Sequence, residues 1–406
     1  MIRPLLFAVI LLPLLAPAVS AQQPDEHLQR AERVLRATPL IDGHNDLPWA
    51  IRRDTTAPMD VDAYDLRRRT PGHTDLARLR AGMIGGQFWS VYIPGDVADS
   101  GYARMQLEQI DIARRVIERY PELEWALTAQ ALREAHRNGR IGSLLGVEGG
   151  HAIENSLGAL RAYYDLGARY MTLTHNVTLD WADAATDTAR HGGLTPFGEQ
   201  VVREMNRIGM LVDLSHVSPA TMSDALNVTS APVIFSHSSA RGVADHPRNV
   251  PDSILRRLPA NGGVVMVTFV PVFISQPLID WNASLERAAA EARTRFSADA
   301  AAQGRAVAAW RASNPAPKAT LAQVADHIDH IRRVAGVDHV GIGGDFDGIS
   351  EVIVGLEDVS TYPALFAELS RRGWSEEDLR KLAGETILRV MERAEAVSRR
   401  WPAERP

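Results

Sequence analysis

Eight short apolar runs, separated by stretches with helical spacing, are the feature that most limits how this chain can fold. Most of the runs are nearly continuous in apolar residues and rich in β-branched ones, which is typical of parallel strands buried on both faces. The runs are Pro39–Asp46, Met83–Ile93, Ile141–Glu148, Ala168–His175, Met210–His216, Pro232–His237, Gly263–Val270 and His339–Asp345.

Segments between the runs carry the usual signals of helix ends. Ser218 followed by Pro219 suits a helix start, and Gly209 suits a helix end. The alternation of strand and helix through eight rounds predicts an α/β fold, namely a (β/α)8 TIM-like barrel. A doubly wound sheet is the alternative, but no G-x-G-x-x-G follows the first run, which disfavours a dinucleotide fold. The predicted helices are Glu154–Asp165, Phe197–Arg207, Ser218–Leu226, Asp252–Leu258 and Leu321–Ala335.

Two stretches do not fit this alternation of strand and helix. Arg52–Arg80 is charged, and we expect an elaborated loop there after the first strand. Trp281–Pro317 is rich in Ala, Arg and Glu, and we expect an inserted helical excursion after strand seven. Neither stretch is predicted to be a separate domain, so residues 22–406 are expected to form a single (β/α)8 domain.

The first 21 residues have the form of a secretory signal peptide. Arg3 precedes the apolar run Leu5–Ala18, and the small residues Val19-Ser20-Ala21 suit cleavage after Ala21. Since the run is shorter than the ~20 residues of a membrane span, an uncleaved anchor is the less favoured alternative. We expect an exported protein, periplasmic or secreted, with no stable membrane anchor after cleavage.

Composition restricts both the metal ligands and the partners. The 406 residues include no Cys, so any metal ligand must be His, Asp or Glu. The formal net charge is −6, and Lys and Arg form no cluster, which argues against a nucleic-acid partner.

Polar side chains stand at the carboxyl ends of six of the runs, which converge on one mouth in a barrel. His44 and Asp46 are two residues apart on a strand, so both side chains point the same way and can grip one ion. A mixed set of His, Asp and Glu suits zinc, and one carboxylate can bridge two ions that share a hydroxide. These strand-end residues are His44, Asp46, Glu148, His175, His216, His237 and Asp345.

Other ionisable residues fit this site less well. His151 is expected to orient the Glu148 loop or to have a purely structural role. His327 and His330 lie at helical i, i+3 spacing and could pair on a metal, but a solvated or capping role is favoured. Asp213 faces away from His216 by strand alternation and is expected to pack or to form an ion pair. Asp42 lies deeper than His44 and is expected to support the metal ligands rather than bind metal.

These residues together resemble the membrane (renal) dipeptidase family, zinc-dependent dipeptidases of the amidohydrolase-like superfamily. The matching motifs lie between Pro39 and Val390, which is nearly all of the mature chain. They are Asp42–Trp49, Gly146–His151, Leu173–His175, Asp213–His216, Phe235–Ser239, Arg248–Asp252 and Gly341–Gly348.

The resemblance implies two zinc ions per chain. His44, Asp46 and Glu148 would hold one ion. Glu148, His216 and His237 would hold the other, with Glu148 bridging. Related barrels that use a carboxylated lysine as the bridge are disfavoured, because Lys318 and Lys381 are the only lysines and neither lies near a strand end.

The resemblance also implies roles around the substrate. His175 would stabilise charge on the scissile carbonyl oxygen, and Arg248 would pair with the free carboxylate. Asp345 would bind the amino group and help to move the proton to the leaving amine, and Trp49 would line the pocket. Mammalian members carry a carboxylate-binding Tyr near the position of Phe273, so carboxylate recognition would rest more on Arg248 here.

The implied function is hydrolysis of free dipeptides, with tolerance of a D-residue in the second position, through a hydroxide bridging two metals. A homodimer is common in the family. An amidase or lactonase using the same two-metal site is the alternative enzyme, and a solute-binding protein using the barrel mouth is the alternative without catalysis.

Overall fold

The structure is a computed structural model, and it describes residues 25–96 and 101–401. The predicted signal segment, residues 1–21, lies outside the described residues. Within the described ranges, no helix has both the length and the apolar character needed to cross a membrane.

Eight parallel strands close into a barrel, which confirms the predicted fold. The order is β1–β2–β4–β5–β6–β7–β8–β9, and pairing of Asp42 with Ile342 joins the last strand to the first. Every predicted run contains one of these strands. They are β1 (Leu40–Asn45), β2 (Ile84–Ser90), β4 (Ile141–Glu148), β5 (Ala168–Thr172), β6 (Leu211–Asp213), β7 (Ile234–Phe235), β8 (Val264–Val267) and β9 (Val340–Ile342).

A ninth strand, β3 (Leu123–Trp125), was not predicted. It pairs with the start of β4, Leu123 opposite Ile141, whereas the later residues of β4 pair with β5 from Leu145 onward. With three residues and a central Glu124, β3 has neither the length nor the apolar continuity of the other runs. It extends the sheet at the amino end of β4 and is not one of the eight strands that close the barrel.

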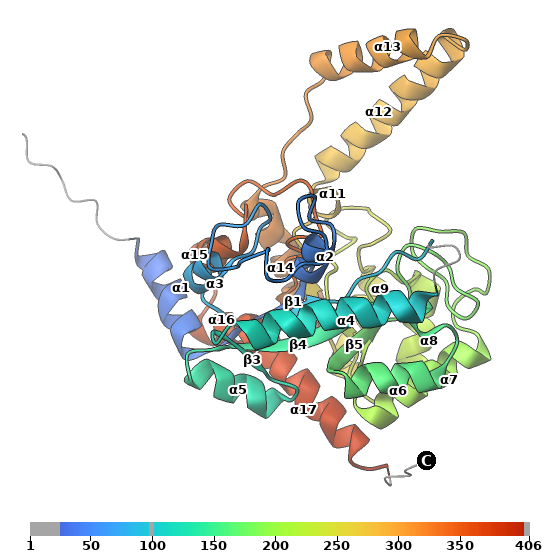
Figure 1. Cartoon of the computed structure of the whole chain (residues 1–406). Coiled ribbons are helices and arrows are strands. Elements are labelled where there is room, and N and C mark those ends of the chain that lie inside the picture. Colours follow the sequence, from blue (N-terminus) through green and yellow to red (C-terminus); the bar gives the residue numbers. More distant parts are fainter. Residues whose placement is uncertain (1–24, 97–100, 402–406) are drawn as a thin grey trace, which may run out of the picture.

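Helices surround the barrel (Figure 1). The predicted helices are present, with two corrections. Glu154 and Asn155 have φ of 47° and 57°, so the helix expected from Glu154 begins at Leu157, after the Ser156 cap. The helix expected over Asp252–Leu258 is two short helices. The helices around the barrel are α1 (Glu26–Ala37), α2 (Leu47–Arg52), α3 (Leu76–Ala81), α4 (Tyr102–Arg119), α5 (Ala129–Arg137), α6 (Leu157–Asp165), α7 (Pro196–Ile208), α8 (Pro219–Val228), α9 (Asp252–Leu255), α10 (Leu258–Asn261), α14 (Leu321–Ala335), α15 (Tyr362–Arg371), α16 (Glu376–Arg380) and α17 (Thr386–Ser398).

Short helical turns complete the chain between these elements. The 3₁₀ turns are η1 (Gly150–Ile153), η2 (Val337–His339) and η3 (Val359–Thr361), and the π-helical turn η4 (Lys381–Glu385) joins α16 to α17. One buried cluster collects side chains from seven of the barrel strands and from α17, among them Phe88, Tyr170 and Leu388. Because the core takes up this part of the barrel, the carboxyl ends of the strands are left to carry polar groups.

The predicted excursion after the seventh barrel strand is a helical hairpin. After β8 and the short α11 (Pro271–Ile274), α12 (Gln276–Arg295) and α13 (Ala300–Ser313) stand away from the barrel (Figure 1). Burial within the two long helices is limited to Leu278, Ala292 and Ala302. The predicted loop Arg52–Arg80 is mostly turns and ends in α3.

Candidate active site

The strand-end side chains converge on one mouth of the barrel, as the sequence predicted. His44 belongs to β1, Asp46 directly follows that strand, and Glu148 is the last residue of β4. His216 and His237 come from the loops after β6 and β7. His216 has φ of 69°, a conformation that non-glycine residues adopt rarely, and this local turn brings its imidazole into the mouth.

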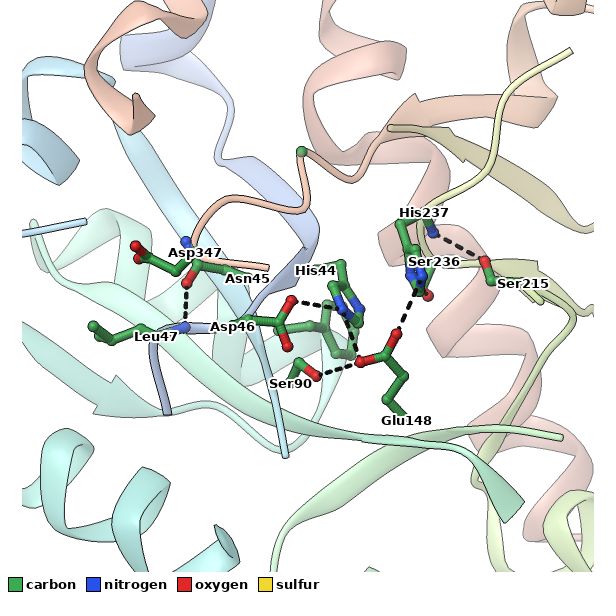
Figure 2. A network of polar contacts seen from close by, with 12 residues as sticks. His44, Asn45, Asp46, Leu47, Ser90, Glu148, Ser215, Ser236, His237 and Asp347 are labelled. Atoms are coloured by element: carbon green, nitrogen blue, oxygen red, sulfur yellow. Dashed lines mark hydrogen bonds and ion pairs between the residues drawn. The ribbon is translucent and has the colours of Figure 1, made fainter. Parts of the chain in front are cut away.

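Glu148 lies at the centre of the cluster, and its two carboxylate oxygens face different histidines (Figure 2). Oε2 is 3.4 Å from His44 Nε2, and Asp46 Oδ2 is 3.2 Å from the same nitrogen. Oε1 is 3.1 Å from His216 Nε2 and 3.4 Å from His237 Nε2. This is the geometry of a carboxylate able to bridge two cations.

Hydrogen bonds fix which nitrogen of His216 and of His237 can accept a cation. His216 Nδ1 lies 3.0 Å from Asn176 Oδ1, an acceptor, so Nδ1 carries the proton. Ser236 Oγ donates to Asp213 at 2.6 Å, so it accepts from His237 Nδ1 at 2.8 Å. Both Nε2 atoms are therefore lone-pair atoms, and they lie 2.9 Å apart.

Two facing lone pairs at this distance repel unless a cation lies between or beside them, so the residues fit a metal ion. His44 Nε2 and Asp46 Oδ1 are also buried and have no hydrogen-bond partner among the described residues. Three overlapping groups have ligand atoms close enough to share an ion. They are His44, Glu148 and His237; Glu148, His175 and His216; and His44, Asp46 and Asp345.

The pKa shifts of the clustered histidines and Glu148 also indicate that this site attracts positive charge. Burial, then the charges of Arg248 and of His44 respectively, holds the pKa of His216 and of His237 well below the ordinary value, which keeps both neutral. Burial opposes ionisation of Glu148, yet the charge of the neighbouring His44 holds the pKa of Glu148 well below its usual range. Burial also opposes a charge on His44, but Tyr170, Glu148 and Asp46 raise its pKa well above the ordinary value. The carboxylates thus attract a cation at His44, which a metal ion can supply instead of a proton.

Asp213 does not form the predicted ion pair. Its buried carboxylate accepts hydrogen bonds from Thr172 Oγ1 at 2.6 Å, from Ser236 Oγ at 2.6 Å, and from the backbone N–H of Ser215 and of Ser236. Alternation does turn it away from His216, but it reaches the neighbouring His237 through Ser236. Of the two predicted roles, packing and an ion pair, only the ion pair is wrong, because the partners of the buried Asp213 are hydroxyl and N–H groups.

Asp42 has the supporting place predicted for it, although it does not touch the His44 ring. Its carboxylate accepts from the backbone N–H of His44 at 2.8 Å and of Gly344 at 3.1 Å, and from the hydroxyl of Tyr362. The His44 ring is instead fixed by Tyr170, whose hydroxyl lies 2.8 Å from Nδ1. Asp42 therefore ties β1 to the loop after β9.

A cavity of about 350 Å³ opens over this cluster of candidate metal ligands. Arg248 is buried beside it, donating to Ser238 Oγ at 3.3 Å and to the His237 carbonyl at 3.2 Å, while its Nε has no partner among the described residues. Burial lowers the pKa of Arg248 to about 10, so the guanidinium stays charged at neutral pH. The residues that line the cavity are Asp46, Trp49, Tyr92, Glu148, His175, Asn176, His216, Arg248, Val270, Phe273, Asp345, Gly348 and Ile349.

Asp345 and His175 lie in the same cavity, at the places predicted for them. Asp345 has φ of 65°, and its backbone N–H donates to the His44 carbonyl at 3.0 Å. Burial, with Asp46 and Glu148 nearby, raises the pKa of Asp345 well above its ordinary value. His175 Nε2 lies 3.8 Å from Glu148 Oε1, and burial lowers the pKa of this histidine.

Among the cavity residues that sequence reasoning missed, Tyr92 and Asn176 contact other residues of the site. Tyr92 stacks edge-on to Trp49 at 4.9 Å and lies 4.8 Å from the ring of His175. Asn176 holds His216. Asn176 directly follows a predicted strand and Tyr92 is the next to last residue of another, so a position near a strand end was the available signal.

His151, His327 and His330 do not join the site. His151 Nε2 lies 3.0 Å from the carbonyl of Ile93, and burial lowers the pKa of His151 to about 4, so a neutral His151 ties the loop after Glu148 to the segment after β2. His327 and His330 are buried, so the solvated position predicted for them is wrong. They contact different elements, because α14 packs this face against neighbouring segments. His327 lies 3.0 Å from both the Ala240 nitrogen and the Ile274 carbonyl, and His330 lies 2.7 Å from Asp252.

A closed α/β barrel with a His, Asp and Glu cluster at its mouth defines the class of metal-dependent hydrolases. The chain belongs to the membrane dipeptidase family, peptidase family M19, whose sequence profile matches residues 28–405. It is therefore an enzyme of a metal-dependent peptidase family, which confirms the resemblance read from the motifs.

Solved structures agree with this assignment. The probable dipeptidase PvdM from Pseudomonas aeruginosa is 23% identical, covers 92% of this chain and 100% of its own, and superposes with a TM-score of 0.78. A metallo peptidase from Rhodobacter sphaeroides, bound to a phosphinate mimic of the dipeptide L-Ala-D-Ala, is 26% identical, with coverage of 88% and 99% and a TM-score of 0.71. A further dipeptidase of family M19 is also 26% identical, with coverage of 88% and 98% and a TM-score of 0.71.

Proposed function

We propose that this enzyme is a zinc-dependent dipeptidase with two zinc ions per chain. The observation that carries the proposal is the pair of facing Nε2 atoms of His216 and His237, 2.9 Å apart beside Glu148. His44, Asp46 and Glu148 would hold one ion, and Glu148, His216 and His237 the other. Nitrogen and carboxylate ligands without thiolates suit zinc.

The proposed substrate is a free dipeptide. A dipeptide is a zwitterion, and the cavity offers one group for each end, Arg248 for the carboxylate and Asp345 for the amino group. Trp49 would close one side of the cavity. Cleavage of free dipeptides in preference to blocked ones follows from this pairing.

The chemistry divides between the ions and the side chains. When bound, two zinc ions would supply a shared hydroxide as nucleophile and would polarise the scissile carbonyl. His175 would donate a hydrogen bond to the developing oxyanion. Asp345 would hold the amino group as a carboxylate and would relay the proton of the attacking hydroxide to the leaving amine.

Tolerance of a D-residue in the second position is part of the proposal. The assigned contacts hold the two charged ends and the carbonyl, and none is assigned to the second side chain. The L-Ala-D-Ala mimic bound to the Rhodobacter sphaeroides protein supports this substrate class.

We also propose that residues 22–406 form one domain, that the protein is exported without a stable anchor, and that it forms a homodimer.

A panel of substrates tests the proposal. Purified enzyme is assayed on L-Ala-L-Ala, L-Ala-D-Ala, N-acetylated L-Ala-L-Ala and a simple lactone, with and without a chelator. We expect hydrolysis of both free dipeptides, abolished by the chelator. Equal rates on the N-acetylated substrate would contradict the role of Asp345, and a preference for the lactone would favour the lactonase alternative. Dipeptide binding without turnover would favour the solute-binding alternative.

A further inference from the structure

A second hollow, of about 710 Å³, lies at the base of the α12–α13 hairpin. Val270, Gly348 and Ile349 line both this hollow and the catalytic cavity, so the two spaces adjoin. The catalytic cavity alone, at about 350 Å³, is large enough for a dipeptide of two alanines. The adjoining hollow is therefore available to a larger substrate.

One face of α12 gives the hollow an apolar wall. Leu278, Trp281 and Leu285 follow the i, i+3, i+7 spacing that places side chains on one side of a helix. Trp281 Nε1 donates to the Asn314 carbonyl at 2.8 Å, and its ring packs on Trp310 at 5.7 Å. Since its polar atom is satisfied, the indole of Trp281 offers carbon surface to the hollow.

The opposite wall leads back to the residue assigned to the substrate's amino group. Gly348, Ile349, Ser350 and Glu351 line the hollow and follow Asp345 closely in the chain. Gly348 lies hard against that carboxylate, since a Cβ there would come within 2.5 Å of Asp345 Oδ1. A residue whose amino group pairs with Asp345 would thus have its side chain beside this wall, whereas Arg248 and Phe273 lie together at 5.2 Å and would receive the carboxylate end.

We infer that the hollow receives a bulky apolar side chain on the amino-terminal residue of the substrate, an inference that rests on the proposed dipeptidase function. The aromatic and aliphatic wall of α12 would pack on that side chain, and the hairpin would thereby set specificity for large first residues. Packing of an aromatic side chain on Trp281 is expected to be worth about tenfold in kcat/KM.

The test compares three dipeptides, L-Ala-L-Ala, L-Phe-L-Ala and L-Ala-L-Phe, on the zinc-loaded enzyme. We expect the wild-type enzyme to prefer L-Phe-L-Ala to L-Ala-L-Ala. Trp281→Ala is expected to reduce kcat/KM for L-Phe-L-Ala about tenfold and to leave L-Ala-L-Ala unchanged. Leu285→Ala, which leaves the contact between Trp281 and Trp310 in place, should act in the same direction. Phe296→Ala, near the far end of the hairpin, is the matched control and should change neither substrate.

Three results would overturn the inference. They are no preference for the bulky first residue, an equal loss on L-Ala-L-Ala, or a loss confined to L-Ala-L-Phe. If no dipeptide is hydrolysed, the proposed function fails, and the same dipeptides are then titrated calorimetrically against the intact enzyme. Tighter binding of L-Phe-L-Ala, lost in Trp281→Ala, would still support the hollow, and equal binding of all three dipeptides would refute it.

Discussion

Ser236 Oγ lies 2.8 Å from His237 Nδ1 and donates its own proton to Asp213 at 2.6 Å. This arrangement determines the tautomer of His237, because a hydroxyl that donates to a carboxylate can only accept from the imidazole. The lone pair of His237 is therefore held on Nε2, the atom that faces Glu148 and His216. Asp213, three positions before the proposed zinc ligand His216, thus sets the tautomer of His237, the proposed ligand after the next strand.

The first prediction concerns this relay. Ser236→Ala removes the acceptor for His237 Nδ1, so zinc affinity at the His216 and His237 site should fall about 10- to 100-fold. Competition with a chromophoric chelator measures the affinity. Ser238→Ala, on the same loop but without a hydrogen bond to His237 Nδ1, serves as the control. Unchanged zinc affinity in Ser236→Ala would show that the relay does not orient the ligand.

The second prediction concerns the carboxylate end of the substrate. Arg248→Lys keeps the charge but loses the planar fork, so KM for L-Ala-L-Ala should rise about tenfold with a smaller change in kcat. The amide of the same dipeptide, which has no carboxylate, should be a poor substrate for both enzymes and equally poor. Steady-state kinetics on the two substrates provides the measurement. A matching loss on the amide would place Arg248 in a structural role only.

The third prediction concerns acid stability and a histidine outside the site. Burial lowers the pKa of His327 from 6.5 to about 4, so folding requires the neutral ring. The contribution of the neutral His327 ring to the free energy of unfolding is complete above pH 6.5. It is lost as the pH falls toward 4, and the loss is about 3 kcal/mol at most. His327→Gln can keep a hydrogen bond to Ala240 or Ile274 and does not titrate, so its unfolding temperature should fall less between pH 7 and pH 4.5 than that of the wild type. Parallel acid curves for the two proteins would exclude this role.

The sequence predicted the barrel because strands buried on both faces leave nearly continuous apolar runs. It missed β3, whose three residues interrupt that pattern with Glu124. It also placed the candidate metal ligands at the mouth, because strand ends converge in any such barrel.

The pattern of apolar and polar residues along the sequence could not predict which side chains contact one another across strands. The contact of Ser236 with Asp213 depends on two strands lying side by side, and the inward turn of His216 depends on its φ of 69°. Alternation within one strand carries no information about either. The buried place of His327 likewise follows from how α14 packs, whereas the sequence had favoured a solvated or capping role.

The most direct test of the central claim is the zinc content of the purified enzyme, measured together with its turnover of L-Ala-L-Ala during chelator titration. The proposed site predicts two zinc ions per chain, loss of turnover as zinc is removed, and recovery when zinc is restored. Less than one zinc per chain, with full turnover that the chelator does not affect, would contradict the proposed two-zinc dipeptidase.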